Sequence, residues 1–143
     1  MGAEPPPAEF DTVADVLERK ARLRGEDPFL TYGDTRVSFA ELDRRANVVA
    51  NNLAAEGVEP GDTVCLFCYN SLEYVSTYFA LAKLGAIVAP VDTRFTGETL
   101  QAVLSRTEAS TVLIDAETRE AYEAVRNQVP NVTTEYFVGE GDG

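Results

Sequence analysis

Hydrophobic residues recur every three to four positions in several segments of the chain, which predicts a series of amphipathic helices. The clearest begins at Ser38, where Glu41 completes a capping box, and runs to about residue 56. A second capping box, Asn70 and Glu73, opens a helix that ends at Gly85. Further helices are expected after the N-cap Asp11 or Thr12 as far as Gly25, and over residues 97–107 and 116–128.

The apolar stripes of these helices are predicted to face the core rather than a partner. In the first three helices they consist of the following residues: Val13, Val16, Leu17 and Leu23; Leu42, Ala46, Val49 and Leu53; and Leu72, Val75, Phe79 and Ala82.

Short apolar runs without polar alternation lie between the later helices, as is typical of strands that are covered on both faces of a sheet. They occupy residues 63–69, 86–91, 111–114 and 133–138. Strands that alternate with helices predict a layered α/β fold with a mostly parallel sheet, flanked by helices and joined by right-handed crossovers. Nearer the N-terminus, residues 29–32 and 36–39 flank a glycine turn, which predicts a small antiparallel hairpin.

The length of 143 residues favours one folded unit. We expect a flexible Pro-rich arm over residues 1–9, an α/β subdomain over residues 10–138 and a flexible acidic tail over residues 139–143. The longest apolar stretch, residues 78–91, is interrupted by Lys83, Gly85 and Pro90, so no membrane span is expected. No secretory signal pattern begins the sequence, and we expect a cytoplasmic protein.

The charge balance limits the binding partners that we expect and indicates the kind of organism from which the protein comes. There are 24 acidic against 12 basic side chains, a net charge of −12, so nucleic acid and anionic membrane surfaces are disfavoured partners. Lys20 and Lys83 are the only lysines, beside ten arginines. A chain that is rich in acid and poor in lysine suits a cytoplasm loaded with salt, because salt screens its self-repulsion. This composition predicts a halophilic source.

Several kinds of catalytic and metal chemistry are excluded by residue types. The chain has no His, so a Ser-His or Cys-His catalytic pair cannot form. Cys65 and Cys68 are the only thiols, too few for a zinc site, and their odd separation in a strand directs them to opposite faces as core thiols. Neither the dinucleotide-binding loop G-x-G-x-x-G nor the P-loop G-x-x-x-x-G-K-[ST] is present in the sequence. The carboxylates Asp43, Asp62, Asp92 and Asp115 share no sequence context and are expected to be solvated surface groups.

The carboxyl ends of parallel strands are where such sheets present ligand contacts. Asp92, Thr93 and Arg94 follow directly after an apolar strand, and Arg94 could pair there with a phosphate or a carboxylate. The alternative is that Arg94 forms an ion pair with Glu98 or with another surface acid.

An ordered set of segments resembles one known family. The set consists of Gly57-Val58-Glu59-Pro60-Gly61-Asp62, then Asn70-Ser71-Leu72-Glu73, then Leu84-Gly85-Ala86, preceded by the helix and hairpin segments over residues 12–53. In this combination and spacing, the chain from about residue 10 to 115 resembles the amino-terminal part of the AMP-forming acyl-CoA synthetases, within the adenylate-forming superfamily of ligases.

The resemblance implies an activity for a complete enzyme only. Such enzymes use ATP and Mg²⁺ to convert a carboxylic acid, a fatty acid for example, to an acyl-adenylate and then transfer the acyl group to coenzyme A. The family's phosphate loop and its catalytic lysine have no counterpart in this sequence, so no catalytic residue is assigned, and the chain alone is expected to be inactive and to bind no cofactor. The resemblance places Asp92, Thr93 and Arg94 as contacts near the coenzyme A thiol channel, and Arg119 near the nucleotide end of the coenzyme.

Three interpretations therefore remain open at this stage. The first is the amino-terminal subdomain of such a ligase, whose partner is the remainder of the enzyme or a complementary subunit. The second is a stand-alone, non-catalytic module that binds acyl-CoA or another protein. The third is an unrelated flavodoxin-like binding domain. Because a piece cut from a larger domain leaves apolar surface exposed, a homodimer is also conceivable.

Overall fold

The architecture comes from a computed structural model, which describes residues 13–32, 34–69 and 71–138. Two helices, α1 (Val13–Arg24) and α2 (Phe39–Ala55), enclose the strands β1 (Pro28–Tyr32) and β2 (Thr35–Ser38) in the sequence. Strands and helices then alternate in the following order: β3 (Thr63–Phe67), α3 (Leu72–Leu84), β4 (Ile87–Pro90), α4 (Gly97–Thr107), β5 (Thr111–Ile114), α5 (Arg119–Val125) with a 3₁₀ turn η2 (Arg126–Gln128), and β6 (Thr134–Phe137).

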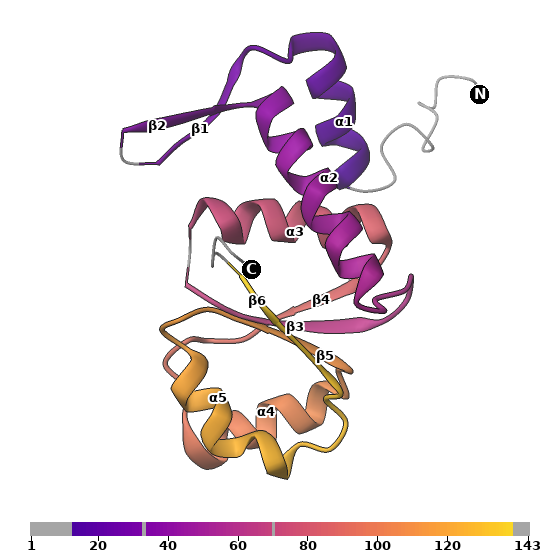
Figure 1. Ribbon diagram of the computed structural model, residues 1–143. Coiled ribbons are helices and arrows are strands. Elements are labelled where there is room, and N and C mark those ends of the chain that lie inside the picture. The colour runs from indigo at the N-terminus through magenta and orange to yellow at the C-terminus, as the bar shows by residue number, and fades with distance from the viewer. Residues whose placement is uncertain (1–12, 33, 70, 139–143) are drawn as a thin grey trace, which may run out of the picture.

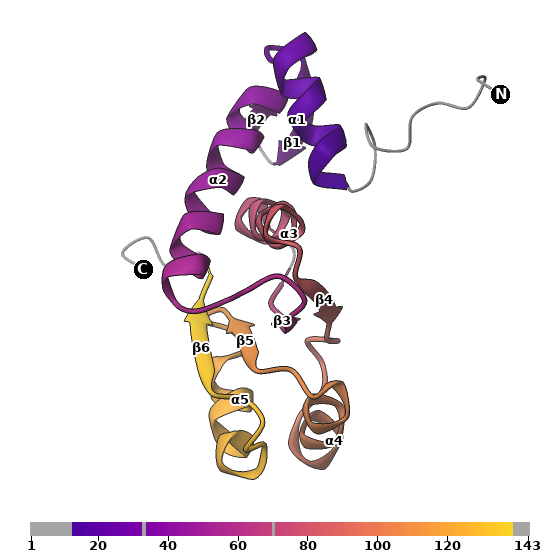
Figure 2. The ribbon, with the colours of Figure 1, turned by 90° about the vertical axis from the view of Figure 1, so that its right-hand side faces the viewer.

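The main sheet has four parallel strands in the order β4-β3-β5-β6, and β1 and β2 pair separately as an antiparallel hairpin. Helices α2 and α3 lie side by side on one face of the sheet, and α4 and α5 cover the other face (Figures 1 and 2). Helix α1 and the hairpin pack on the outer side of α2 and α3 (Figure 2). The layered α/β fold with a parallel sheet and a small antiparallel hairpin is confirmed.

A separate hydrophobic cluster fills each face of the sheet. On one face, Leu53 of α2 and Leu81 of α3 pack against Val64, Leu66 and neighbouring strand residues. On the other face, Leu100 and Leu104 of α4 and Tyr122 of α5 pack against alternate strand residues, which include Phe67 and Ile114. The strands therefore carry continuous apolar runs because their two sets of alternating side chains are both buried.

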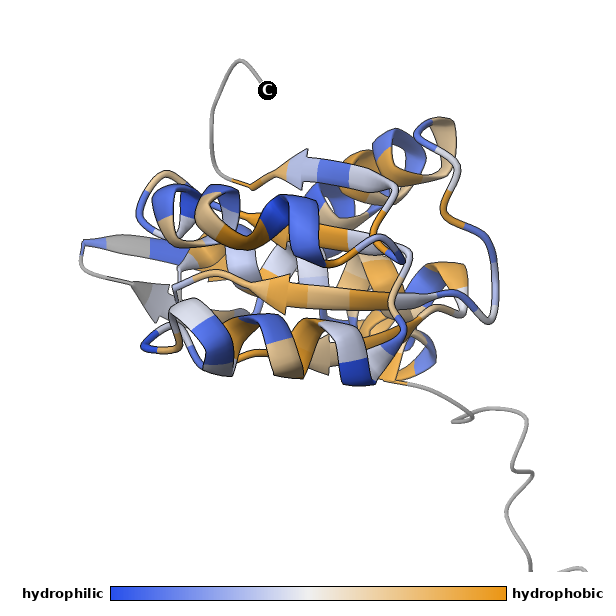
Figure 3. Ribbon diagram, turned by 90° about the horizontal axis from the view of Figure 1, so that it is seen from below, coloured by the Kyte–Doolittle hydropathy of each residue, from blue (hydrophilic) through white to orange (hydrophobic). Residues whose placement is uncertain are grey.

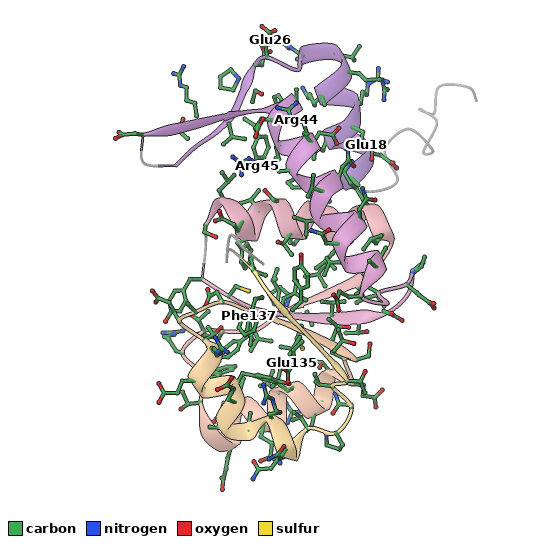
Figure 4. The ribbon with its side chains drawn as sticks, in the orientation of Figure 1. Glu18, Glu26, Arg44, Arg45, Glu135 and Phe137 are labelled. Atoms are coloured by element: carbon green, nitrogen blue, oxygen red, sulfur yellow. The ribbon has the colours of Figure 1, made fainter. Side chains whose placement is uncertain are left out.

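Helix α1 is joined to α2 and α3 by a small apolar cluster and by an ion pair. Leu17, Leu42 and Leu72 from the three helices meet in the cluster. Beside it the ammonium group of Lys83, on a side chain only 8% exposed, donates to Glu18 of α1 at 2.6 Å and to Asp43 of α2 at 2.7 Å. Figure 4 labels Glu18 on α1, beside α2. Burial alone would lower the pKa of Lys83, but its hydrogen bonds to the two carboxylates raise it overall.

The predicted starts of two helices are wrong. Helix α3 begins one residue later than expected, because its N-cap is Ser71, whose hydroxyl accepts a hydrogen bond from the Tyr74 backbone N–H. Helix α5 begins at Arg119 rather than at residue 116, because Asp115 and Thr118 form a hydrogen-bonded turn first. The expected caps Asp11, Thr12 and Asn70, the arm at residues 1–9 and the tail at residues 139–143 lie outside the described residues.

Two apolar stripes expected in the core are partly uncovered. In α1 only Leu17 of the predicted stripe is buried, together with Ala14, whereas its remaining members are exposed. In α3 only Leu72 of the predicted stripe is buried, and Val75, Phe79 and Ala82 are half-buried. Within the part of the chain that the structure describes, no helix is long and apolar enough to cross a lipid bilayer.

Candidate functional site at the carboxyl edge of the sheet

The carboxyl ends of β3 and β5 lie next to each other, since Phe67 pairs with Ile114 in register. The chain leaves β3 towards α3 on one face of the sheet and leaves β5 towards α5 on the opposite face (Figure 2). This divergence makes the pair a topological switch point, the place where open α/β sheets form a crevice for ligands.

Asp115 occupies the switch point and bridges it. One carboxylate oxygen accepts a hydrogen bond from the Tyr69 backbone N–H at 2.8 Å, across 46 residues of sequence. The other accepts from the backbone N–H groups of Glu117 and Thr118, both at 2.9 Å. Both oxygens of this carboxylate are therefore used to hold the β3 and β5 loops together, and the group is not a free ligand contact.

Thr118 completes the bridge from within the protein. Its side chain is almost fully buried, its hydroxyl donates to the Phe67 carbonyl at 2.7 Å, and the hydroxyl oxygen accepts from the Asp115 backbone N–H at 3.0 Å. This pair was not predicted, although an Asp followed three residues later by a Thr directly after a strand is a usable turn signal.

We expect Thr118→Val to destabilise the fold, because valine keeps the side-chain volume and leaves the buried Phe67 carbonyl without its donor. The cost of an unpaired buried group is about 1–3 kcal/mol. Urea unfolding followed by circular dichroism measures it. Thr118→Ser, which keeps the hydroxyl, should retain most of the stability. Equal stability of Thr118→Val and the wild type would show that the bridge contributes nothing.

The predicted contact residues Asp92, Thr93 and Arg94 form a tight turn after β4 at the same edge of the sheet. The Asp92 carboxylate accepts from the Arg94 guanidinium at 3.0 and 2.7 Å, and also from the Arg94 backbone N–H at 2.8 Å. The Arg94 side chain is 85% exposed. The alternative interpretation, an ion pair with Glu98 or another surface acid, is therefore confirmed, with Asp92 as the partner.

Asp92 and Arg94 are both charged, and their opposite charges cancel each other locally. Hydrogen bonds from the Arg94 side chain and backbone lower the pKa of Asp92 to about 2, and the same hydrogen bond raises the pKa of Arg94. Both groups are ionised at neutral pH. An incoming anion would have to share Arg94 with Asp92, so the turn does not form a dedicated phosphate site.

The four carboxylates singled out from the sequence are half-buried groups at the surface, and each of them also has a partner within the protein. Asp43 pairs with Lys83, Asp62 accepts from the Glu59 backbone N–H at 2.9 Å, and the partners of Asp92 and Asp115 are given above. Each carboxylate holds a turn or joins elements.

Arg119 lies on α5, away from the turn after β4. Its guanidinium stacks 4.6 Å from the ring centroid of Phe137 on β6 and pairs with Glu123 at 3.1 Å. In the 3₁₀ turn η2 that follows α5, Arg126 pairs with Glu135 of β6 (Figure 4 labels Glu135 and Phe137). The structure therefore places Arg119 in a network between α5 and β6.

The two cysteines are core thiols on opposite faces of the sheet, as predicted. Cys65 belongs to the cluster under α4 and α5, and Cys68 to the cluster under α2 and α3. Burial raises the pKa of both thiols. They are protonated and inert at neutral pH.

The described residues do not fit a nucleotide with its metal ion. At the carboxyl edge Asp115 is occupied by three backbone donors and Arg94 is neutralised by Asp92. Within the described ranges no three His, Cys, Asp or Glu side chains are grouped so that they could hold a metal. We therefore derive no catalytic step through ATP or Mg²⁺ from these residues.

A family model of AMP-binding enzymes matches residues 17–142, which is most of the chain. The chain belongs to this family. The long-chain-fatty-acid–CoA ligase FadD13 of Mycobacterium tuberculosis is 31% identical over 106 residues, 73% of this chain and 21% of the relative. The feruloyl-CoA synthase of an Amycolatopsis species is 34% identical over 107 residues, 75% of this chain and 22% of the relative.

Solved structures show the same relationship. The anthranilate CoA ligase AuaEII, in complex with anthranoyl-AMP, superposes with a TM-score of 0.81 at 28% identity over 88% of this chain and 24% of that one. The N-terminal domain of FACL13 from Mycobacterium tuberculosis superposes with a TM-score of 0.82 at 27% identity over 87% of this chain and 33% of that domain. This member of the AMP-binding enzyme family therefore spans about a fifth of these curated relatives and a third of a solved N-terminal domain.

Proposed function

We propose that this chain is the amino-terminal scaffold of an AMP-forming acyl-CoA ligase, in which a carboxylic acid is activated with ATP and Mg²⁺ and transferred to coenzyme A. The observation that carries the proposal is the family match over residues 17–142, together with relatives that are acyl-CoA ligases. Fatty acid metabolism is the corresponding cellular role, and the cytoplasm the corresponding compartment.

In this proposal the 143 residues serve as scaffold and hold no catalytic residue. The test is the exchange of pyrophosphate into ATP that depends on a carboxylic acid substrate. It is measured on the purified chain and on the ligase that carries its sequence. We expect exchange from the ligase only. Exchange by the chain alone that persists through repeated purification would overturn the scaffold role. Tight acyl-CoA binding by the chain alone would favour a stand-alone binding module.

The turn after β4 is proposed to contact coenzyme A near its thiol channel, through Asp92, Thr93 and Arg94. In the ligase, Arg94→Ala should raise KM for coenzyme A about three- to tenfold, the loss expected for one partly screened polar contact. Acid-dependent pyrophosphate exchange precedes coenzyme A binding and should not change. Arg106→Ala, on α4, is the matched arginine control. An unchanged KM for coenzyme A would remove this residue from the channel.

We further propose a halophilic source, on the basis of the net charge of −12. Self-repulsion of this charge falls as salt shortens the Debye length to about 3 Å at 1 M. The melting temperature of the purified chain should therefore rise steeply between low and molar KCl. A melting temperature that does not respond to KCl would count against a halophilic origin.

A further inference from the structure

Tyr69 is an open aromatic residue at the carboxyl edge of the sheet. It follows two residues after the end of β3 and is 46% exposed. Figure 3 shows the hydrophobic strands of the parallel sheet with their arrowheads on the same side of the molecule. Because parallel sheets present ligand contacts at this edge, and tyrosine is a common contact residue in interfaces, an open ring here is a candidate for binding.

The backbone of Tyr69 is held firmly although the strand has already ended. The Asp115 carboxylate accepts from its backbone N–H, and the Thr118 hydroxyl donates to the carbonyl at the end of β3. Between these two bonds, the Cys68 thiol donates to a carbonyl of β5 at 3.3 Å. The chain is therefore fixed to β5 and its turn at three successive residues.

The Tyr69 side chain, in contrast, is not used by the part of the chain that the structure describes. It makes no hydrogen bond and no ring contact with any described residue. The Phe137 ring at the end of β6 is different, because the Arg119 guanidinium covers it at 4.6 Å. A tyrosine has only two side-chain torsions to order, so a ring on a fixed backbone can contact a ligand at a small entropic cost.

The charged groups at this edge already have partners. Arg94 pairs with Asp92, and Arg119 pairs with Glu123. In a chain with a net charge of −12, such neutralised arginines offer little attraction to phosphate groups. Binding of a nucleotide at this edge would therefore depend on its flat base more than on its phosphates.

We propose that Tyr69 stacks against the adenine base of coenzyme A in the ligase that carries this sequence. The inference rests on the proposed function, in which the turn after β4 contacts the coenzyme. Strand β3 pairs directly with β4, so its end lies about 4.8 Å from that of β4 across the sheet. Adenine is the flat aromatic group of coenzyme A, and Tyr69 is the open ring on the neighbouring strand.

The test compares two acceptor thiols in the ligase: coenzyme A, and pantetheine, which has the same thiol arm but no nucleotide. Tyr69→Ala should raise KM for coenzyme A about five- to tenfold, the lower part of the range for loss of a base–aromatic stack. The variant should leave kcat/KM for pantetheine unchanged, because pantetheine has no base to stack. Pyrophosphate exchange that depends on the carboxylic acid should also stay unchanged, since it needs no acceptor thiol.

Three further variants separate stacking from bulk and from folding. Tyr69→Phe keeps the ring and should stay within about twofold of the wild-type KM for coenzyme A. Tyr69→Leu keeps an apolar side chain without a flat π face and should lose about as much as Tyr69→Ala. Tyr78→Ala, at a tyrosine of α3 that is 38% exposed, is the matched control and should leave this KM unchanged.

The outcomes that contradict the proposal can be told apart. An unchanged KM for coenzyme A in Tyr69→Ala would overturn the stacking contact, and the proposed function would stand as long as the ligase exchanges pyrophosphate. Equal losses with coenzyme A and with pantetheine would also overturn it, because Tyr69 would then act on the thiol arm or on the fold. A ligase that neither exchanges pyrophosphate nor forms a thioester with either acceptor would remove the proposed function together with the contact.

Discussion

Phe67→Ala should destabilise the folded chain by about 4 kcal/mol, the usual range for emptying a buried phenylalanine site being 3–5 kcal/mol. Phe67 is fully buried at the end of the central strand β3, within the cluster beneath α4 and α5. Helices α4 and α5 also pack against each other, so the site can collapse only in part. The free energy of unfolding from urea titration measures the loss, and a loss below about 1 kcal/mol would contradict a close-packed core here.

Two further variants keep this prediction testable. A single domain has only about 5–15 kcal/mol of stability, so Phe67→Ala could leave the chain unfolded. Ile114→Val, the in-register neighbour on β5, removes one buried methylene group and should cost about 0.5–1.5 kcal/mol. Val48→Ala is the exposed control, since Val48 is 55% exposed on α2, and it should change stability by less than about 0.5 kcal/mol.

The order and type of the helices and strands could be predicted, because the burial of one face of a helix or of both faces of a strand fixes the spacing of apolar residues in the sequence. The apolar run over β3 and its neighbours indicated strands covered on both faces, and the structure buries Val64, Leu66 and Phe67 on alternate sides. The same reasoning separated Cys65 from Cys68. Periodicity, however, reports that a helix face is apolar and does not report what covers it. The stripe with Val75 and Phe79 was therefore assigned to the core although the chain itself leaves it half open.

The candidate site was predicted less well, because its contacts join residues far apart in the sequence. The Asp115 carboxylate meets the Tyr69 backbone N–H across the ends of two strands, and no local pattern contains that pair. In contrast, the contact of Arg94 with Asp92 lies within one turn, and the sequence placed both residues at the correct edge of the sheet. The sequence left open whether Arg94 pairs with a surface acid, and the structure shows that its partner is Asp92.

Helix α3 is half-open on the flank that carries Val75 and Phe79. Its orientation therefore depends on the contacts that it makes elsewhere. Lys83, near the end of α3, supplies one of these by joining α1 and α2 through Glu18 and Asp43. Phe29 of the hairpin has edge contacts with Phe39 of α2 and with Phe79 of α3, and these contacts depend on the spacing of the two helices.

Lys83→Met should therefore destabilise the chain by about 3 kcal/mol, at the low end for breaking a buried ion pair because the two carboxylates are partly exposed. Methionine preserves the volume but leaves Glu18 and Asp43 without their cation, so adding Asp43→Asn should restore part of the loss. Lys20→Met, at an exposed lysine, is the control.

Because its partners raise the pKa of Lys83, the stabilisation is complete below the unfolded-state pKa of about 10.4 and is lost as pH rises through the higher folded-state value. Urea titrations at pH 7 and above about pH 10.4 should show the wild-type advantage shrinking at the higher pH. An advantage that is absent at pH 7 would show that the ion pair does not hold the helices.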